Sequence, residues 1–256
     1  MTKEFLKQQL ADMGLKSDDS LMLHSSMKAI GGVEGGADTV IDAFMGYLSD
    51  GMFMTPAHTW RQMSDTYNVF DPAVEPACVG IIPNIFMKRE NVYRSLHPTH
   101  SIAAFGRNAM EYVRGDENFD TPCNPAGCFG RLKDINAKIL LAGVTHARNT
   151  YIHSIEESFD VPDRFTENPS VFYVKMPDGN LKKVKMYRHY NPCMAHISES
   201  FDKLMDYYFE TGAAVRVKLG NADSILCDAG RLYDATAAVL KKDINFFIPL
   251  NKYSGC

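Results

Sequence analysis

LMLHSSMKAIGGVEGGADTVIDAFMGYL, residues 21–48, sets a short apolar run, a glycine-rich turn and an amphipathic segment one after another. The run LMLHS (21–25) predicts a buried strand, and the apolar residues of DTVIDAFMGYL (38–48) recur on one broad helical face. The glycines between them are typical of a loop that leads from a strand into a helix. The stretch therefore predicts a strand, loop and helix unit of the kind that builds an α/β fold.

The same alternation continues along the chain. Three further strands are predicted, each followed by a helix: GMFMTPA (51–57) by IIPNIFMK (81–88), SIAAF (101–105) by NAMEYV (108–113), and KILLAGV (138–144) by NTYIHSIEES (149–158). Near-continuous apolar strands that alternate with helices favour a sheet covered by helices on both faces. We expect an α/β fold with a central mixed sheet flanked by helices.

The ends of the chain add helices and a hairpin. At the N-terminus, Thr2 is a candidate helix cap and Gly14 a candidate stop. KMPDGNLKKVKM (175–186) has Asp-Gly between two runs, which predicts an inserted surface hairpin near 170–187. Further on, SFDKLMDYYFE (200–210) and AGRLYDATAAVL (229–240) are predicted helices on either side of a strand VRVKL (215–219). No linker or repeat divides the chain, so we expect one domain over residues 1–256.

The bulk composition excludes several classes of protein. Hydrophobic residues make up 45% of the chain, charged residues 23%, and the net charge of −4 indicates no nucleic-acid partner. The start, MTKEFLKQQL, has no continuous apolar region, and no stretch approaches the roughly 18 apolar residues of a membrane span. We expect a cytoplasmic protein without membrane contact, and allow for a homodimer.

Six scattered cysteines predict neither disulfides nor a metal site: Cys78, Cys123, Cys128, Cys193, Cys227 and Cys256. In a reducing cytosol such residues are mostly small core hydrophobes. Cys123 and Cys128 form the closest pair, and no second pair completes a zinc site. We therefore assign no metal.

NTYIHSIEES (149–158) crowds one histidine and two carboxylates. If it is helical, Glu156 lies on the same side as His153, and Glu157 is within the same reach. A carboxylate partner fixes the tautomer of an imidazole and stabilises its protonated form, so the free ring nitrogen becomes a better general base. An exposed helix with solvated side chains explains the same pattern, and from this motif alone both interpretations remain open.

Two other segments carry anion-binding features. In LHSSMKAIGGVEGG (23–36) a strand ends in two hydroxyls before a glycine-rich turn, whose backbone amides attract anions such as phosphates. The segment matches neither the phosphate-binding P-loop nor the dinucleotide fingerprint. In RSLHPTHSIAAFG (94–106) a proline lies between two histidines and no third ligand is near, which favours hydrogen bonding to a ligand, or buried histidines, over a metal. Arg94 and Ser101 add donors suited to anions.

In order along the chain, four blocks resemble the aminoglycoside 3-N-acetyltransferase family: LHSSMKAIGGVEGGADTVIDAF (23–44), FDP (70–72), RSLHPTHSIAAFG (94–106), and ILLAGV (139–144) followed by NTYIHSIEES. The similarity continues in GNADSILCDAGRLYDA (220–235) and so spans most of the chain. The resemblance implies an antibiotic N-acetyltransferase that moves an acetyl group from acetyl-coenzyme A to an amine. It also implies an α/β fold distinct from that of the GNAT acetyltransferases.

The resemblance also assigns site residues. Thr150 to Glu156 match the family pattern T-x-x-H-x-x-E, which makes His153 the general base and Glu156 the carboxylate that orients it. Two blocks match segments that line the coenzyme A site: His24, Ser25, Ser26, Met27 and Lys28, and then His97, Pro98, Thr99, His100 and Ser101. Donors in the first block would stabilise the negative thioester oxygen during attack.

The acceptor stays open at this point. An aminoglycoside carries several ammonium groups, and the carboxylates available to bind them are Asp65, Asp71, Glu157, Glu199 and Asp202. The segment SFDVPDRFTENPSVFYVKM (158–176) shows no excess of acid, so another amine remains an alternative. Two other functions compete: a Ser/His hydrolase or thioesterase with Ser25 or Ser26 as nucleophile, which lacks the expected G-x-S-x-G elbow, and a non-catalytic coenzyme A-binding sensor.

Overall fold

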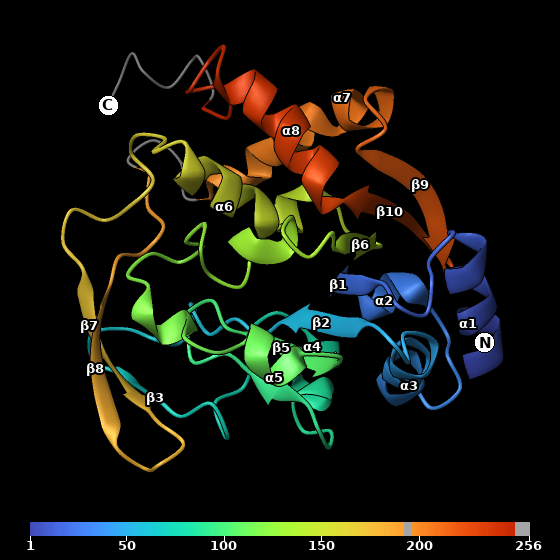
Figure 1. Ribbon diagram of the computed structural model, residues 1–256, viewed down its shortest axis with the longest axis horizontal. Helices are drawn as coiled ribbons and strands as arrows, with labels where there is room; N and C mark the ends of the chain where they lie inside the picture. Colours follow the sequence, from blue (N-terminus) through green and yellow to red (C-terminus); the bar gives the residue numbers. More distant parts are fainter. Residues whose placement is uncertain (192–195, 249–256) are drawn as a thin grey trace.

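The computed structural model describes residues 1–191 and 196–248, and a seven-stranded mixed sheet runs through its middle (Figure 1). β1 (Ser20–Ser25) pairs in parallel with β2 (Met52–Pro56) and with β6 (Lys138–Ala142). Four strands extend the sheet by antiparallel pairing: β5 (Ile102–Gly106) and then β4 (Tyr93–Arg94) beyond β2, and β10 (Ala222–Asp228) and then β9 (Ala214–Leu219) beyond β6. The predicted α/β fold with a central mixed sheet is confirmed.

Helices cover both faces of this sheet, because the apolar strands bury side chains on both sides. Along β1, Met22 packs into one hydrophobic core while Leu21 and Leu23 pack into the other. The second core takes helices α1 (Lys3–Asp12), α3 (Ala37–Tyr47) and α4 (Ile81–Phe86). The first takes α5 (Ala109–Tyr112), α6 (Tyr151–Ser158), α7 (Met205–Glu210) and α8 (Ala229–Leu240). In Figure 1, α6, α7 and α8 lie above the sheet and α3 lies below it.

Local sequence explains where the first helices begin. The side-chain oxygen of Thr2 accepts a hydrogen bond from the Phe5 amide at 3.2 Å, as expected of an N-cap, and α1 ends just before Gly14. Ser26 caps the short helix α2 (Met27–Ile30) in the same way. The turn before α3 needs glycine, since Gly35 and Gly36 have φ of 74° and 65°, where other residues are strained.

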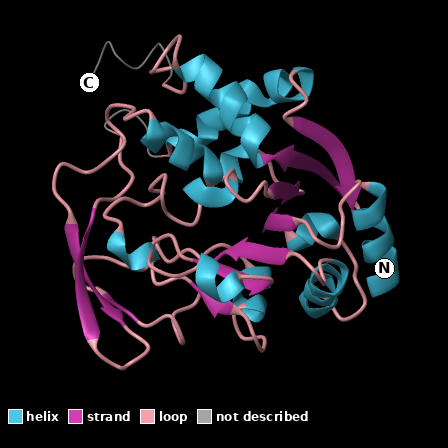
Figure 2. Cartoon of the chain, in the orientation of Figure 1, coloured by secondary structure: helices cyan, strands magenta, loops and turns pink. Residues whose placement is uncertain are grey.

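A second, three-stranded sheet lies beside the main one. β7 (Ser170–Lys175) and β8 (Leu181–Met186) form an antiparallel hairpin where the sequence predicts one, and β3 (Val69–Phe70) pairs in parallel with β7. This sheet has a small hydrophobic core of its own, which includes Phe70 and Phe172. Figure 2 shows that long loops connect it to the rest of the chain. We call this unit, β3 with β7 and β8, the side sheet.

The structure differs from the prediction near the C-terminus. The single helix predicted over 200–210 is a 3-10 helix, η4 (Ile197–Leu204), followed by α7. Strand β10 was not predicted, although Gly220 and Asn221 separate it from β9 as a hairpin turn would. Three further 3-10 turns complete the described elements: η1 (Asp116–Asn118), η2 (Gly130–Leu132) and η3 (His146–Arg148).

The sheet topology defines one edge as the place for a site. β1, β2 and β6 are parallel, so their carboxyl ends meet at the same edge, and the antiparallel β5 begins there because Ile102 pairs with Pro56. Ligands of open α/β sheets bind outside the carboxyl ends of the strands.

Within the described residues, no helix combines the length and the apolar character needed to cross a lipid bilayer.

Candidate active site

A cavity of about 650 Å³ opens at this edge of the sheet. Its wall is built by the end of β1, by the loops that follow β2 and β6, by the loop before β5 and by the segments after β8. Residues far apart in sequence therefore face one space. Six of the eight histidines of the chain contribute to the wall: His24, His58, His100, His153, His189 and His196. A cavity of this volume is in the usual range for a small-molecule site.

His153 and Glu156 form the hydrogen-bonded pair that helical spacing predicts. Nδ1 of His153 lies 3.1 Å from Oε2 of Glu156, and the imidazole is 13% exposed on the cavity side. Burial lowers the pKa of His153 and the nearby ring of His189 lowers it further, while the Glu156 carboxylate acts in the opposite direction. The net direction is downward, so the ring is neutral at pH 7.

Arg164 holds the other oxygen of the same carboxylate. Its Nε donates to Oε1 of Glu156 at 2.7 Å, and both side chains are almost fully buried. Burial alone would raise the pKa of Glu156, but the hydrogen bond from His153 and the charge of Arg164 outweigh it, so the pKa lies below its ordinary value. Glu156 is therefore an ionised group fixed from two sides. Arg164 was not predicted, since a lone arginine eight positions beyond Glu156 gives no local signal.

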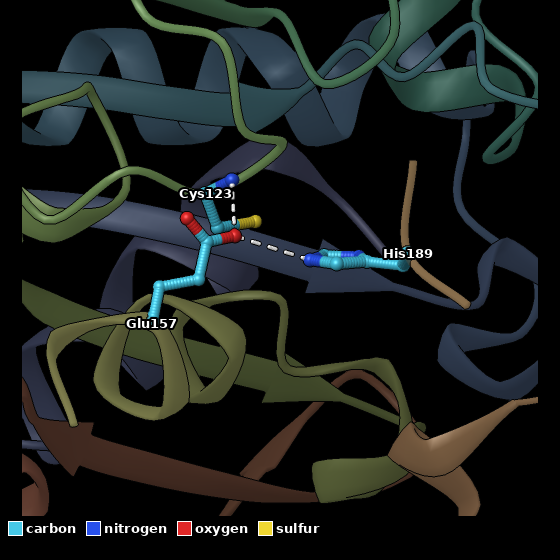
Figure 3. Close-up of side chains that lie close together, drawn as sticks. All are labelled: Cys123, Glu157 and His189. Carbon is cyan, nitrogen blue, oxygen red and sulfur yellow. Dashed lines mark hydrogen bonds and ion pairs between the residues drawn. The ribbon is translucent and has the colours of Figure 1, made fainter. Parts of the chain in front are cut away.

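A second histidine and glutamate pair lies directly beside the first. Nε2 of His189 is 3.2 Å from Oε1 of Glu157, and the backbone N–H of Cys123 donates to the same oxygen at 2.8 Å (Figure 3). The His189 ring stacks on that of His153, with centroids 4.2 Å apart. His189 follows β8, so the side sheet brings it to the cavity, and nothing in its own neighbourhood of the sequence indicates this.

Cys123, Glu157 and His189 also have the ligand types of a metal site. One ligand atom from each lies within 4.8 Å of the others. Burial and the nearby carboxylates raise the pKa of the Cys123 thiol well above its ordinary value, and a neutral thiol is a weak ligand. Oε1 of Glu157 already accepts two hydrogen bonds. These two hydrogen bonds explain why the three residues lie together, since Cys123 holds Glu157 and Glu157 holds His189.

The part of the wall next to His189 carries further uncharged histidines, since the His100 and His189 rings have centroids 5.2 Å apart. Nε2 of His58 lies 3.0 Å from the Thr150 hydroxyl, and the His58 and His100 rings have centroids 4.7 Å apart. Burial holds the pKa of both histidines well below the ordinary value and lowers that of His24 to about 3. These imidazoles are therefore neutral hydrogen-bonding groups at neutral pH.

The ten residues predicted to bind coenzyme A divide into two groups. His24, Ser25, Thr99 and His100 line the cavity. The other six lie outside its wall: Ser26, Met27, Lys28, His97, Pro98 and Ser101. Ser26 caps α2, and Lys28 is exposed.

Three more of the outer six also have structural contacts. Nδ1 of His97 accepts from the Thr99 and His100 amides, at 3.2 and 2.9 Å. The Pro98 carbonyl accepts from the Thr59 hydroxyl at 2.6 Å, and the Ser101 hydroxyl donates to a backbone carbonyl at 2.7 Å. These contacts shape the loop that carries Thr99 and His100. The role of the ten residues in binding coenzyme A stays a prediction.

Of the five carboxylates predicted for an acceptor, one lines the cavity. That residue is Glu199, in η4. Asp71 pairs with Lys175 at 2.8 Å, and Asp202 accepts from the Thr145 hydroxyl at 2.7 Å. Glu157 lies beneath His189 and is only 4% exposed.

Comparison with known proteins gives one consistent result. The family model for aminoglycoside 3-N-acetyltransferases matches residues 22–241. The chain is 27% identical over 258 residues to aminoglycoside N(3)-acetyltransferase IX of Micromonospora chalcea, covering 91% of both proteins. It is 29% identical over 187 residues to aminoglycoside N(3)-acetyltransferase IV of a Salmonella species, covering 72% of this chain and 68% of that protein.

Solved structures agree with this result. A histidine-to-alanine mutant of aminoglycoside acetyltransferase AAC(3)-IVa, solved in complex with a gentamicin, superposes with a TM-score of 0.84 at 26% identity, covering 100% of this chain and 93% of that one. AAC-IIIb, solved with coenzyme A, superposes with a TM-score of 0.81 at 20% identity, covering 94% of this chain and 97% of that one, and shows the fold alone. The fold and site define an acyltransferase of the α/β class that is not of the GNAT fold. Within that class, the chain belongs to the aminoglycoside 3-N-acetyltransferase family.

Proposed function

We propose that the protein transfers an acetyl group from acetyl-coenzyme A to an amine of an aminoglycoside or a related amine, with His153 as the general base and Glu156 as the group that orients it. The observation that carries this proposal is the His153 and Glu156 pair in the cavity wall, with Nδ1 of the ring on the carboxylate. Family membership supports the reaction type, and the coenzyme A complex of AAC-IIIb supports the donor.

The geometry suits removal of a proton from the attacking amine. Nδ1–H donates to Glu156, which leaves Nε2 as the acceptor. The neutral ring can take the proton, and the ionised Glu156 stabilises the imidazolium that forms. A base of this kind typically contributes ~10² to 10⁴ in rate. The amine attacks the thioester directly, so no cysteine acyl-enzyme is needed.

The acetyl donor would lie against the turn that follows β1. Ser25 lines the cavity at the end of that strand. The Ser26 amide is not available to the thioester oxygen, because it donates to the Ala142 carbonyl at 2.9 Å. His24 and Ser25 are the members of the HSSMK segment (24–28) that line the cavity, so their side chains would stabilise the charge that develops on this oxygen.

A Ser/His hydrolase is less well supported. Within the described residues, neither the Ser25 nor the Ser26 hydroxyl is hydrogen bonded to a histidine ring, and Ser26 Oγ accepts from the Ala29 amide instead. A serine nucleophile needs a base within hydrogen-bond reach. The direct attack of an amine has no such requirement.

The test is an assay of thiol release from acetyl-coenzyme A with a panel of amines that includes several aminoglycosides. We expect release to depend on the amine. His153→Ala should lower kcat/KM by ~10² to 10⁴ and leave coenzyme A affinity, measured by calorimetry, nearly intact.

His196→Ala is the matched control, because His196 lies in the wall but its ring contacts Trp60 rather than Glu156. It should retain most of the activity. Unchanged turnover in His153→Ala would contradict the base assignment. Rapid thiol release without any amine would favour the hydrolase.

A further inference from the structure

The wall of the cavity is rich in cations and poor in carboxylates. Among the described residues that line it, four are arginines, and Glu199 is the one acidic residue. The cations are Arg61, Arg148, Arg164 and Arg188. The segments outside the description, 192–195 and 249–256, contain no aspartate or glutamate in the sequence. Those two segments therefore cannot supply another acidic residue.

Two of these arginines are engaged by the protein. Arg164 is paired with Glu156. Arg188 donates to the Met63 and Trp60 carbonyls, at 2.8 and 2.6 Å, which fixes its position, and no carboxylate in the described part of the chain pairs with it.

Arg61 and Arg148 are exposed, and within the described residues neither has a carboxylate partner. The Arg61 guanidinium lies over the Trp60 ring, 5.4 Å from its centroid. The field at the mouth of the cavity is therefore positive.

The buried carboxylates of α6 do not reverse this field. Glu156 is neutralised by Arg164 and is 1% exposed. Glu157 is covered by His189 and accepts from Cys123. Neither side chain is part of the wall that an ammonium group would touch.

The rest of the wall offers neutral hydrogen-bonding groups. Burial keeps the His24 and His58 rings uncharged. The hydroxyl side chains of Ser25, Thr99 and Ser198 also line the cavity. Uncharged donors and acceptors of this kind match the hydroxyl groups of a sugar.

We propose that the preferred acceptor is a hydroxylated amine with a single ammonium group, neutral or anionic elsewhere, such as an amino sugar or its phosphate. The proposal rests on the proposed function and narrows its acceptor. The reacting amine loses its charge before attack, whereas every additional ammonium keeps its charge beside the arginines. Like charges repel, and the repulsion grows as the groups are removed from water. The phosphates of coenzyme A would also bind to arginines of the wall. Binding them would not supply the carboxylates that a polycationic acceptor needs.

The test compares kcat/KM for glucosamine, glucosamine 6-phosphate and neamine, which carries four amino groups, at saturating acetyl-coenzyme A. We expect both single-amine sugars to exceed neamine at least tenfold. The ratio of kcat/KM for glucosamine 6-phosphate to that for neamine should fall as the salt concentration is raised, because salt screens exposed charges. A kcat/KM for neamine equal to or above that of both sugars would overturn the proposal.

A charge variant gives an independent readout. Ser198 lines the cavity next to Glu199, and Ser198→Asp adds a second carboxylate there. Ser198→Asp should raise the kcat/KM for neamine relative to that for glucosamine about two- to fivefold, the range of an exposed ion pair. The uncharged Ser198→Asn should leave this ratio unchanged. An equal effect of both variants would contradict the electrostatic argument.

Failure of the reaction is distinguished by binding. If no acceptor releases thiol, the proposed function fails. Calorimetry of His153→Ala with coenzyme A present then still compares the acceptors. Glucosamine 6-phosphate is expected to bind more tightly than neamine, and the reverse order would sink the acceptor proposal on its own.

Discussion

The imidazole of His189 lies over that of His153, with ring centroids 4.2 Å apart and planes inclined by 30°. Neighbouring glutamates of α6 hold the two rings, Glu156 for His153 and Glu157 for His189. Two imidazoles this close repel each other when both are protonated. The stack therefore favours the neutral form of His153, which is the form that a general base requires.

Replacing His189 should change the pH dependence of the reaction. Burial first, and the His189 ring second, lower the pKa of His153. His189→Phe keeps a flat ring in the stack but removes the imidazole that lowers the pKa of His153, so this pKa should rise. The acidic limb of kcat/KM, measured from pH 5 to 9, should move to higher pH.

His196→Phe is the control for this shift, because its ring contact is Trp60. Its pH profile should match that of the original protein. An acidic limb that stays in place, or moves to lower pH, in His189→Phe would contradict the coupling of the two rings.

Glu156→Gln should destabilise the fold as well as slow the reaction. The substitution leaves the buried guanidinium of Arg164 without its charge partner, and breaking a buried pair in this way typically costs about 3 to 5 kcal/mol. Urea unfolding measures the loss. The double variant with Arg164→Met should lose less than the sum of the two single variants. Strict additivity would show that the two side chains do not act as a pair.

Stability should fall in mild acid. Burial lowers the pKa of His24 to about 3 and that of His146 to about 4, against 6.5 in the unfolded chain. Between these values the unfolded chain binds protons that the folded chain does not, so the free energy of unfolding falls as the pH drops below about 6.5. Each such histidine contributes at most ~1.4 kcal/mol per pH unit.

Urea midpoints at pH 7, 6, 5 and 4 measure this loss, and His146→Phe isolates one contribution. The variant should lose stability less steeply below pH 6.5, because its ring does not titrate. If the free energy of unfolding falls equally steeply with decreasing pH in both proteins, His146 does not stay neutral in the folded state.

Gly143→Ala should weaken the acetyl donor site. Gly143 follows β6 with φ of +68°, and a Cβ there would overlap the Cβ of Ala29 in α2, the helix that begins two residues after Ser25. Backbone strain costs on the order of 1 to 2 kcal/mol, and the overlap pushes α2 away. The KM for acetyl-coenzyme A should rise. Gly14→Ala is the control, since Gly14 has φ of +80° with open space around it, and it should reduce stability without changing this KM.

Local patterns in the sequence were enough to predict the central strands and the His153 and Glu156 pair. The strands β1, β2 and β6 read as apolar runs because both faces of the sheet are covered, and the pair depends only on helical spacing. Arg164 and His189 were missed because loops beyond α6 and the side sheet bring them to the site. Contacts between distant segments leave no periodic signal.

The side sheet has a core separate from the two cores of the main sheet, and the segment that follows β8 delivers Arg188 and His189 to the cavity. The His153 and Glu156 pair, by contrast, lies on α6, which packs in the main body of the protein. A unit with its own core thus supplies the ring that stacks on His153. A change in how the hairpin packs would therefore reach the proposed base through His189, without any change in the core that holds α6.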